Sequence, residues 1–260
     1  MYKNIFIDLD NTLWDFSTNS KNVLSVLFYR YGLDKYFKDF EEYFKIYSEH
    51  NDYLWEQYSL NKINKDDLNK DRFAYPLRVK NVDLPQVEEG MQENYLPLLA
   101  EQKALLPHCI EVLEYLKNKG YKLYLISNGF VEIQHKKLSG AGLYKYFDKL
   151  FFSEEIKAHK PSKVFFDTAI KSTNSKKKES IVIGDNFLAD IEGAKNAGLQ
   201  QIWFCLSTDV PSELPFKPTH IITNLKEIEN ILLYTLMHIF MVVNLPWNKQ
   251  NLCSVAKKPA

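Results

Sequence analysis

Short apolar runs alternate with amphipathic stretches along the second half of the chain. From about Tyr121 the β-rich runs are YKLYLIS, KLFF, SIVIG, QIWFCL and HIITN, and the stretches between them have helical spacing. One further run, IFIDL, lies close to the amino terminus. This alternation is typical of parallel strands that are covered by helices on both faces. We therefore predict an α/β fold with a Rossmann-like parallel sheet as its core.

The segment from residue 17 to residue 103 has a different pattern. It contains long stretches with helical spacing, such as FEEYFKIYSEHNDYLWEQYSL, and no convincing strand. We predict an all-helical domain inserted after the first strand, so that residues 1–16 and 104–232 form the core domain. Tyr53, Trp55 and Tyr58 recur at helical spacing, and we expect them in the interior of the inserted domain.

Residues 233–260 form an extension that is first apolar and then polar. Its apolar part, LYTLMHIFMVVNLPW, spans roughly fifteen residues and is interrupted by His238 and Asn244, whereas a bilayer span needs about 20. The pattern leaves three interpretations open: a helix packed on the domain or on a partner, an adventitious or disordered extension, and, least favoured, a membrane anchor. The sequence does not fix the role of this extension.

Composition excludes several classes of protein. The chain has 260 residues, of which 45% are hydrophobic, and this is typical of a globular protein. Lys+Arg and Asp+Glu balance at 33 each, so no overall field attracts nucleic acid or an anionic membrane. The three cysteines lack the spacing of a disulfide framework or a metal site, and no signal peptide is evident. We therefore expect a cytoplasmic protein.

Two aspartates follow the first apolar run at a spacing that demands an explanation. In an extended chain alternate side chains share a face, so Asp8 and Asp10 lie side by side at the end of a strand. Like charges that close repel each other, which raises the pKa of one carboxyl and costs stability. The pair therefore indicates a bound metal ion or a catalytic role.

Other polar residues follow later strands in the same way. The predicted strand ends carry Asp8 and Asp10, then Ser127 and Asn128, then Lys160 with Pro161, and finally Gly184, Asp185 and Asp190. Each motif alone is common in ordinary turns. Together and in this order they predict a ligand site, because open α/β sheets bind ligands at the carboxyl ends of their strands.

These motifs resemble those of a known enzyme family. DLDNT, SNG, the Lys160-Pro161 pair and GDNFLAD are similar to the four motifs of the haloacid dehalogenase superfamily, and the helical insert lies where that superfamily places a cap. ISNGF, SEEIKAHKP and IGDNFLADIEGAKNAG are similar to its branch of pyrimidine 5′-nucleotidases. The resemblance implies a HAD-like core, a Mg²⁺ cofactor and hydrolysis of phosphate monoesters, with nucleoside 5′-monophosphates as the expected substrates.

The resemblance also implies roles for individual residues. Asp8 attacks phosphorus and becomes an aspartyl-phosphate, while Asp10 protonates the leaving alcohol and later activates water. Oxygen ligands suit Mg²⁺, and we expect the carboxylates of Asp8 and Asp185 with the backbone carbonyl of Asp10. Lys160 supplies positive charge to the phosphoryl group. Asp190 supports the metal site or holds Lys160, unless it is simply an acid at a helix N-terminus.

Phosphate and substrate contacts complete the expected site. Ser127 donates a hydrogen bond to the phosphoryl oxygens, and the backbone amides of Asn11, Thr12 and Asn128 are further candidate donors. Aromatic residues that lie next to the motifs, Trp14, Phe16 and Phe130, stack on a base or pack between core and cap. The expected partner is a small phosphorylated metabolite and not a nucleic acid polymer, and a membrane is the least favoured partner. The protein is expected to be a monomer or homodimer.

Four functions remain in competition. They are a nucleotidase, a sugar-phosphate phosphatase or phosphomutase, a 2-haloacid dehalogenase, and a non-catalytic binding protein. Halide-displacing relatives have no alkoxide to protonate and typically lack the second aspartate, so Asp10 favours a phosphatase. All four motifs keep reactive side chains, which counts against a protein without catalytic activity.

Overall fold

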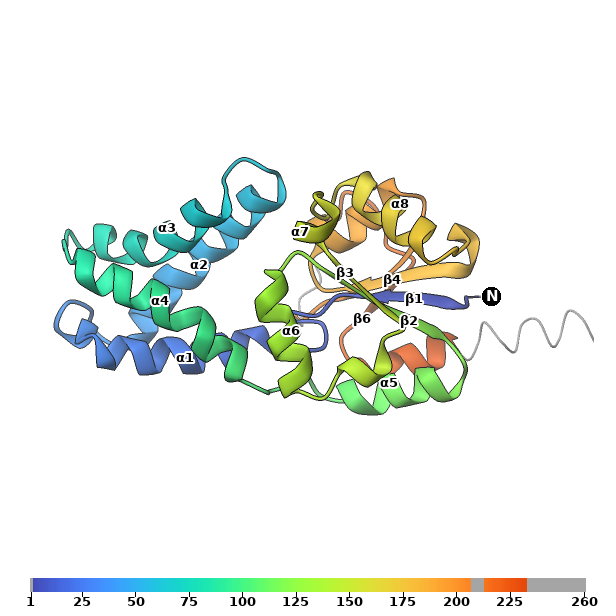
Figure 1. Cartoon of the computed structure of the whole chain (residues 1–260), viewed down its shortest axis with the longest axis horizontal. Helices are drawn as coiled ribbons and strands as arrows, with labels where there is room; N and C mark the ends of the chain where they lie inside the picture. The colour runs from blue at the N-terminus through green and yellow to red at the C-terminus, as the bar shows by residue number, and fades with distance from the viewer. Residues whose placement is uncertain (1, 207–212, 233–260) are drawn as a thin grey trace, which may run out of the picture.

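The core of the molecule is a parallel sheet. The computed structural model describes residues 2–206 and 213–232, and within them six strands pair in the order β3-β2-β1-β4-β5-β6 (Figure 1). All neighbouring strands run parallel. The strands are β1 (Asn4–Ile7), β2 (Lys122–Ser127), β3 (Lys149–Phe152), β4 (Ser180–Gly184), β5 (Gln200–Phe204) and β6 (His220–Ile222). The predicted α/β fold and its six apolar runs are confirmed.

The first strand lies at the centre of the sheet. Ile5 and Ile7 pack into the core on one face, and Phe6 packs into a second core on the other, as alternation along a strand requires. The chain adds β2 and β3 on one side of β1 and then crosses to add β4, β5 and β6 on the other. Since the direction of winding reverses at β1, its carboxyl end is the topological switch point where such sheets bind ligands.

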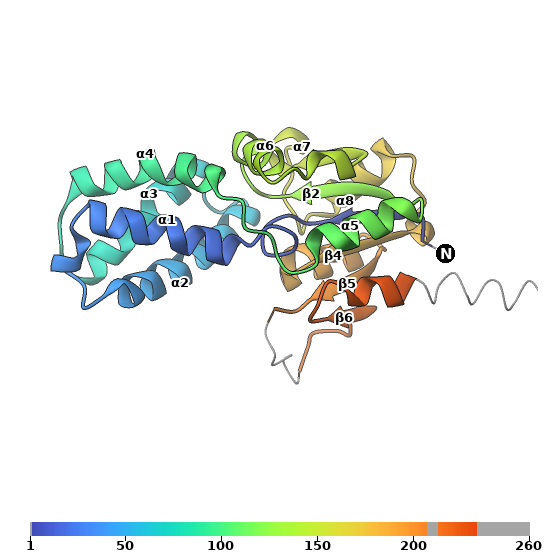
Figure 2. The same cartoon turned by 90° about the horizontal axis from the view of Figure 1, so that it is seen from below.

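Helices cover both faces of this sheet. The core around Ile5 and Ile7 includes side chains from α5, α6 and the helical turns at 227–232, whereas the core around Phe6 includes α8 and α9 (Figure 2). The bounds are α5 (Cys109–Asn118), α6 (Val131–Gly140), α7 (Ser153–Ile156), α8 (Lys163–Ser172) and α9 (Gly193–Asn196), with η2 (Tyr144–Tyr146), η3 (Lys177–Glu179) and the π-helical segment η4 (Phe187–Glu192). Both faces are therefore buried, as expected for a parallel sheet.

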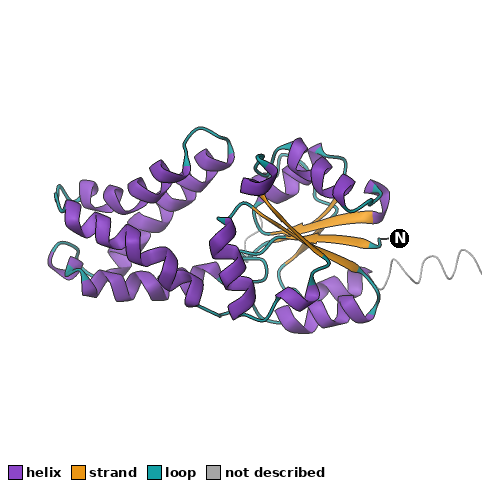
Figure 3. Cartoon of the chain, in the orientation of Figure 1, coloured by secondary structure: helices purple, strands orange, loops and turns teal. Residues whose placement is uncertain are grey.

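A bundle of helices lies between β1 and α5 in the sequence, beside the carboxyl edge of the sheet (Figures 1 and 3). It contains α1 (Phe16–Arg30), η1 (Leu33–Lys35), α2 (Phe40–Ser59), α3 (Lys65–Val79) and α4 (Pro85–Glu101). Asp39 caps α2 and Asn64 caps α3 with a capping box, which explains where both helices begin. The buried rings of Tyr47, Phe73 and Tyr95 contact one another and form much of its interior.

One detail of the predicted bundle interior is wrong. Tyr58 is buried and Trp55 is partly buried, but Tyr53 is 56% exposed. Five residues on an α-helix place Tyr53 roughly 140° away from Tyr58 around the axis, so the two cannot share one apolar face.

Within residues 2–206 and 213–232, no helix is both long enough and apolar enough to cross a membrane. The three interpretations of residues 233–260 concern a segment that lies outside the described residues.

Candidate active site

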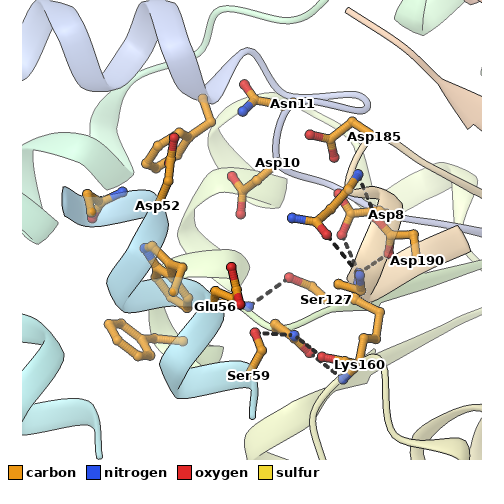
Figure 4. A pocket seen from close by; sticks show the side chains of 18 of the residues that line it. Asp8, Asp10, Asn11, Asp52, Glu56, Ser59, Ser127, Lys160, Asp185 and Asp190 are labelled. Carbon is orange, nitrogen blue, oxygen red and sulfur yellow. Dashed lines mark hydrogen bonds and ion pairs between the residues drawn. The ribbon is translucent and has the colours of Figure 1, made fainter. Parts of the chain in front are cut away.

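A cavity of about 630 Å³ opens between the carboxyl edge of the sheet and the helical bundle. Most of the predicted site residues line it: Asp8, Asp10, Asn11, Phe16, Ser127, Asn128, Phe130, Lys160, Asp185 and Asp190. Figure 4 shows several of them converging from the core, opposite Asp52, Glu56 and Ser59 of α2. The edge of the sheet thus brings together residues that are up to about 180 positions apart in the sequence.

Lys160 is held at the centre of this site by three hydrogen bonds. Its ammonium donates to Asp8 Oδ1 and Asp190 Oδ1, each at 2.6 Å, and to the carbonyl oxygen of Ile126 at 3.3 Å. All three side chains are almost fully buried. Burial alone would lower the pKa of Lys160, but the two carboxylates outweigh this effect and raise it above its ordinary value. Lys160 is therefore a fixed positive charge.

Three carboxylates gather around that charge. Oxygens of Asp8, Asp185 and Asp190 all lie within 4.8 Å of one another. Burial, opposed in part by Lys160, raises the pKa of Asp8 to about 7, and burial followed by repulsion from Asp8 raises the pKa of Asp185. One ammonium does not balance three carboxylates, so the cluster fits a divalent cation that prefers oxygen ligands. Asp8 and Asp185 are the carboxylates predicted to hold it.

The close packing of Asp190 depends on a glycine. A Cβ atom added at Gly184, the last residue of β4, would lie 2.4 Å from the carboxyl carbon of Asp190. Asp190 itself lies in η4, and its Oδ2 accepts a hydrogen bond from the backbone amide of Asn186 at 3.2 Å. Of the roles considered for Asp190, its direct contact with Lys160 agrees with the one that holds the lysine.

The loop after β1 is stabilised by its own hydrogen bonds. Asn11 adopts a positive φ of 57°, and its amide donates to the Trp14 carbonyl at 2.8 Å. The amide of Thr12 donates to the Leu9 carbonyl at 3.3 Å. Both amides thus bond within the turn, and their role as phosphate donors stays a prediction. The Thr12 hydroxyl is fully buried and bonds instead to Asp185, donating to Oδ1 at 3.2 Å and accepting from its amide at 3.1 Å.

Asn128 ties together three parts of the site. Its side-chain amide donates to the carbonyl of Lys160 at 2.8 Å and to Ser59 Oγ of α2 at 3.0 Å, while its Oδ1 accepts from the amide of Lys160 at 2.9 Å. The side chain of Asn128 therefore fixes the backbone that carries Lys160. Its predicted phosphate contact concerned the backbone amide and remains untested.

Two functional candidates escaped the sequence analysis. Gln134 donates to Asp10 Oδ2 and to Ser127 Oγ, both at 2.7 Å, and Lys137 donates to Asp10 Oδ1 at 2.6 Å. Both residues are buried on α6, three positions apart, and line the cavity. The sequence signal for Gln134 and Lys137 was their position. They lie on a helix that begins two residues after SNG, on the same face as Ile133 and Leu138.

The predicted aromatic contacts divide into two groups. Trp14 is fully buried, packs in the main core and does not line the cavity, so of the two roles considered for it the structure agrees with packing and contradicts a substrate contact. Its ring instead lies 4.3 Å from the ammonium of Lys137. Phe16 and Phe130 do line the cavity. Phe130 also packs on Trp55 and Tyr58, with ring centroids 5.2 and 6.0 Å apart, which is the packing between core and bundle that was considered for it.

Fold and site together define a hydrolytic enzyme built on a doubly wound parallel sheet. The family model for haloacid dehalogenase-like hydrolases matches residues 2–198. The chain belongs to this family.

Relatives match between 78% and 89% of the chain. It is 32% identical over 206 residues to the pyrimidine 5′-nucleotidase PynA of Streptococcus pneumoniae, covering 78% of this chain and 84% of PynA. It is 31% identical over 229 residues to the pyrimidine 5′-nucleotidase YjjG of Escherichia coli, covering 88% and 96%. The magnesium-bound crystal structure of the HAD-hydrolase YfnB of Bacillus subtilis matches with a TM-score of 0.79 and 25% identity, covering 89% and 98%. Both the fold and the helical bundle thus have counterparts in this family.

Proposed function

We propose that the protein is a Mg²⁺-dependent phosphomonoester hydrolase that works through an aspartyl-phosphate and acts on nucleoside 5′-monophosphates. The observation that carries the proposal is the contrast between two carboxylates at one sheet edge. Asp8 lies in the acidic cluster with Lys160 (Figure 4). Asp10 instead accepts hydrogen bonds from Gln134 and Lys137. Two carboxyl groups in different surroundings are suited to different catalytic roles.

The first half of the reaction needs a nucleophile and a proton donor. An oxygen of Asp8 attacks phosphorus, and the bond to the leaving oxygen breaks as Asp10 gives that oxygen a proton. Lys160 and the Ser127 hydroxyl stabilise the phosphoryl oxygens. Asp8 and Asp185, with the backbone carbonyl of Asp10, would hold Mg²⁺, which would supply the positive charge that lets one anion approach another.

The second half releases phosphate. Asp10, now ionised, takes a proton from a water molecule, and the water oxygen attacks phosphorus to break its bond to Asp8. Asp8 returns as a carboxylate, and Asp10 is again protonated for the next cycle. Each residue thereby recovers its starting state.

The residues of the helical bundle that line the cavity are suited to a substrate with a polar leaving group. Arg72 is 2% exposed, stacks on Tyr95 with its guanidinium carbon 4.9 Å from the ring centroid, and donates to Asn69. It lines the cavity, takes part in no ion pair of the described residues, and its buried Nε has no hydrogen-bond partner among them. A buried cation without a counter-charge is costly, so we assign Arg72 to electronegative atoms of the leaving group.

Other groups on this wall fit a nucleoside. Asp52 and Glu56, one turn apart on α2, provide acceptors for sugar hydroxyls, and Phe16 and Trp55 provide apolar surface for a base. The names of PynA and YjjG point to the same substrate class. We also propose that residues 17–103 act as a cap that closes over the site and excludes water from the intermediate.

Sugar phosphates are the second candidate class, because acidic and hydroxyl side chains on the same wall suit any polyhydroxylated leaving group. A phosphatase would release phosphate from them, whereas a phosphomutase would isomerise them with a bisphosphate. The cavity therefore defines a set of substrates that one panel of assays can separate.

The test is phosphate release from nucleoside monophosphates and sugar phosphates, with Mg²⁺ and with EDTA. The wild type is compared with Asp8→Asn and with Asp34→Asn, an exposed substitution of the same kind outside the cavity. We expect turnover that needs Mg²⁺, is fastest on pyrimidine monophosphates, and is lost only in Asp8→Asn. Faster turnover of sugar phosphates would overturn the nucleotidase assignment, and chloride release from 2-haloacids in EDTA would overturn the phosphatase.

A further inference from the structure

Both oxygens of the Asp10 carboxyl group are held by one helix. Gln134 Nε2 lies 2.7 Å from Asp10 Oδ2, and Lys137 Nζ lies 2.6 Å from Asp10 Oδ1. The two residues are one turn apart on α6, so they reach the carboxyl group from the same side. This arrangement fixes the direction of the Asp10 carboxyl group rather than merely its position.

The burial of these two side chains is costly unless it serves a purpose. Gln134 is fully buried and Lys137 is 3% exposed. Asp10 is the one carboxylate paired with Lys137 within the described residues, and the Trp14 and Phe16 rings lie 4.3 and 5.5 Å from its ammonium. An apolar side chain would fill the same space at lower cost, because burying a charged pair is rarely favourable on balance. The contacts that Gln134 and Lys137 make with Asp10 therefore call for a functional explanation.

Gln134 links Asp10 to the phosphate-binding hydroxyl. Gln134 Nε2 donates one hydrogen to Asp10 Oδ2 and the other to Ser127 Oγ, both at 2.7 Å. Ser127 Oγ also accepts from the amide of Gly129 at 3.0 Å. Since both lone pairs of the hydroxyl are engaged, its own proton is directed outward to a phosphoryl oxygen. A Cβ atom at Gly129 would lie 2.2 Å from Gln134 Nε2, so the glycine makes this approach possible.

We propose that Gln134 and Lys137 are positioning residues that aim the Asp10 carboxyl group at the leaving-group oxygen. The inference rests on the proposed phosphomonoesterase function and adds two residues to it. The proton moves from Asp10 to the leaving oxygen as the P–O bond breaks, and one returns from water in the second half of the reaction. Gln134 and Lys137 keep all their protons throughout.

The dependence of the rate on the leaving group tests this role. p-Nitrophenolate leaves without protonation, whereas a nucleoside or sugar alkoxide needs a proton from Asp10. The measured quantity is kcat/KM for each substrate, because it reports the steps up to departure of the leaving group and not hydrolysis of the aspartyl-phosphate. The ratio compared is kcat/KM for p-nitrophenyl phosphate divided by kcat/KM for a nucleoside or sugar phosphate. In Lys137→Met and Gln134→Met we expect this ratio to rise at least about tenfold.

Matched controls separate positioning from a general structural defect. Lys136→Met makes the same change at the exposed neighbouring position and should keep the wild-type ratio. Lys137→Arg keeps the charge, so its ratio should lie closer to the wild-type value than the ratio of Lys137→Met. In an Asp10→Asn background, adding Lys137→Met should leave the ratio as in Asp10→Asn alone.

Specific outcomes would overturn the proposal. Equal losses on both substrates would mean that the two residues merely support the fold. A further rise of the ratio in the Asp10→Asn background would mean that they act on the leaving group without Asp10. Gln134→Met does not change the charge, so the same ratio is measured in this variant if Lys137→Met fails to fold. Wild-type protein that hydrolyses no phosphomonoester would refute the proposed function itself, which is a separate result.

Discussion

Lys160 and Asp190 form an ion pair with 2.6 Å between Nζ and Oδ1, and both side chains are almost fully shielded from water. Asp8 contacts the same ammonium at the same distance. The lysine is thereby held between the proposed nucleophile and a carboxylate that takes no part in bond making. In our interpretation, Asp190 sets the position of Lys160 so that Lys160 can serve Asp8 and the phosphoryl group.

Replacing Asp190 by Asn should therefore impair both catalysis and stability. The side chain keeps its shape but loses its charge, so Lys160 is drawn toward Asp8 alone. We expect kcat to fall about 10- to 100-fold, as for residues that orient catalytic groups. The loss in unfolding free energy should stay below the about 3–5 kcal/mol of a fully broken buried pair, because Asp8 still pairs with Lys160.

Steady-state rates and denaturant unfolding check this prediction. Asp148→Asn is the matched control, because Asp148 pairs with Lys117 and Lys122 at the surface. Such pairs contribute at most about 1 kcal/mol, and Asp148 does not line the cavity, so its rate should be that of the wild type. A wild-type kcat in Asp190→Asn would show that Lys160 needs no second carboxylate.

Gly184→Ala should disturb the same ion pair without touching any charged residue. Its Cβ would lie 2.4 Å from Asp190 Cγ and 2.6 Å from Asp190 Cβ, which is far inside van der Waals contact. We expect Asp190 to be displaced and kcat to fall about tenfold or more. The control is Gly140→Ala at the end of α6, whose Cβ would meet Lys103 only at 3.8 Å. Similar rates for both variants would contradict the close packing of Asp190.

Thr12→Val should weaken metal binding. The Thr12 hydroxyl donates to Asp185 Oδ1 and accepts from its amide, so it orients a proposed metal ligand. Valine has nearly the same shape and no hydroxyl. We expect the Mg²⁺ concentration that gives half-maximal rate to rise about 10- to 100-fold, while Thr12→Ser retains the wild-type value. An unchanged metal dependence in Thr12→Val would show that the Thr12 hydroxyl does not contribute to metal binding.

The sequence predicted the strands and the polar residues at their ends for a shared physical reason. Parallel strands buried on both faces are continuous apolar runs, and polar residues that interrupt such runs lie at their ends. Asp8, Ser127 and Asp185 were found in this way, and the reversal of winding at β1 explains why they meet.

The pattern of apolar runs could not predict site residues that lie within helices. Lys137 and Gln134 have the spacing of an ordinary helix, and a polar residue on a helix is usually solvated. Their burial follows from the way α6 packs against the loop after β1, which is a tertiary relationship. Trp14 illustrates the converse: its position next to the motif left both a substrate contact and packing open, and the turn directs its ring into the core.

The acidic cluster should make the stability of the metal-free protein depend on pH in an unusual direction. The pKa of Asp8 rises from 3.8 to about 7 on folding, so between these values the folded state binds a proton that the unfolded state has lost. Stability therefore falls as pH rises through this window, and the destabilisation is complete above about pH 7. The shift of Asp185 has the same sign.

Thermal unfolding in EDTA should show that stability falls between about pH 4 and pH 7, and Asp8→Asn should flatten this slope. Mg²⁺ offsets the repulsion between ionised carboxylates, so it should raise the Tm more above this window than within it. A difference between wild type and Asp8→Asn that does not vary with pH would show that the buried carboxyl of Asp8 titrates as it does in the unfolded chain.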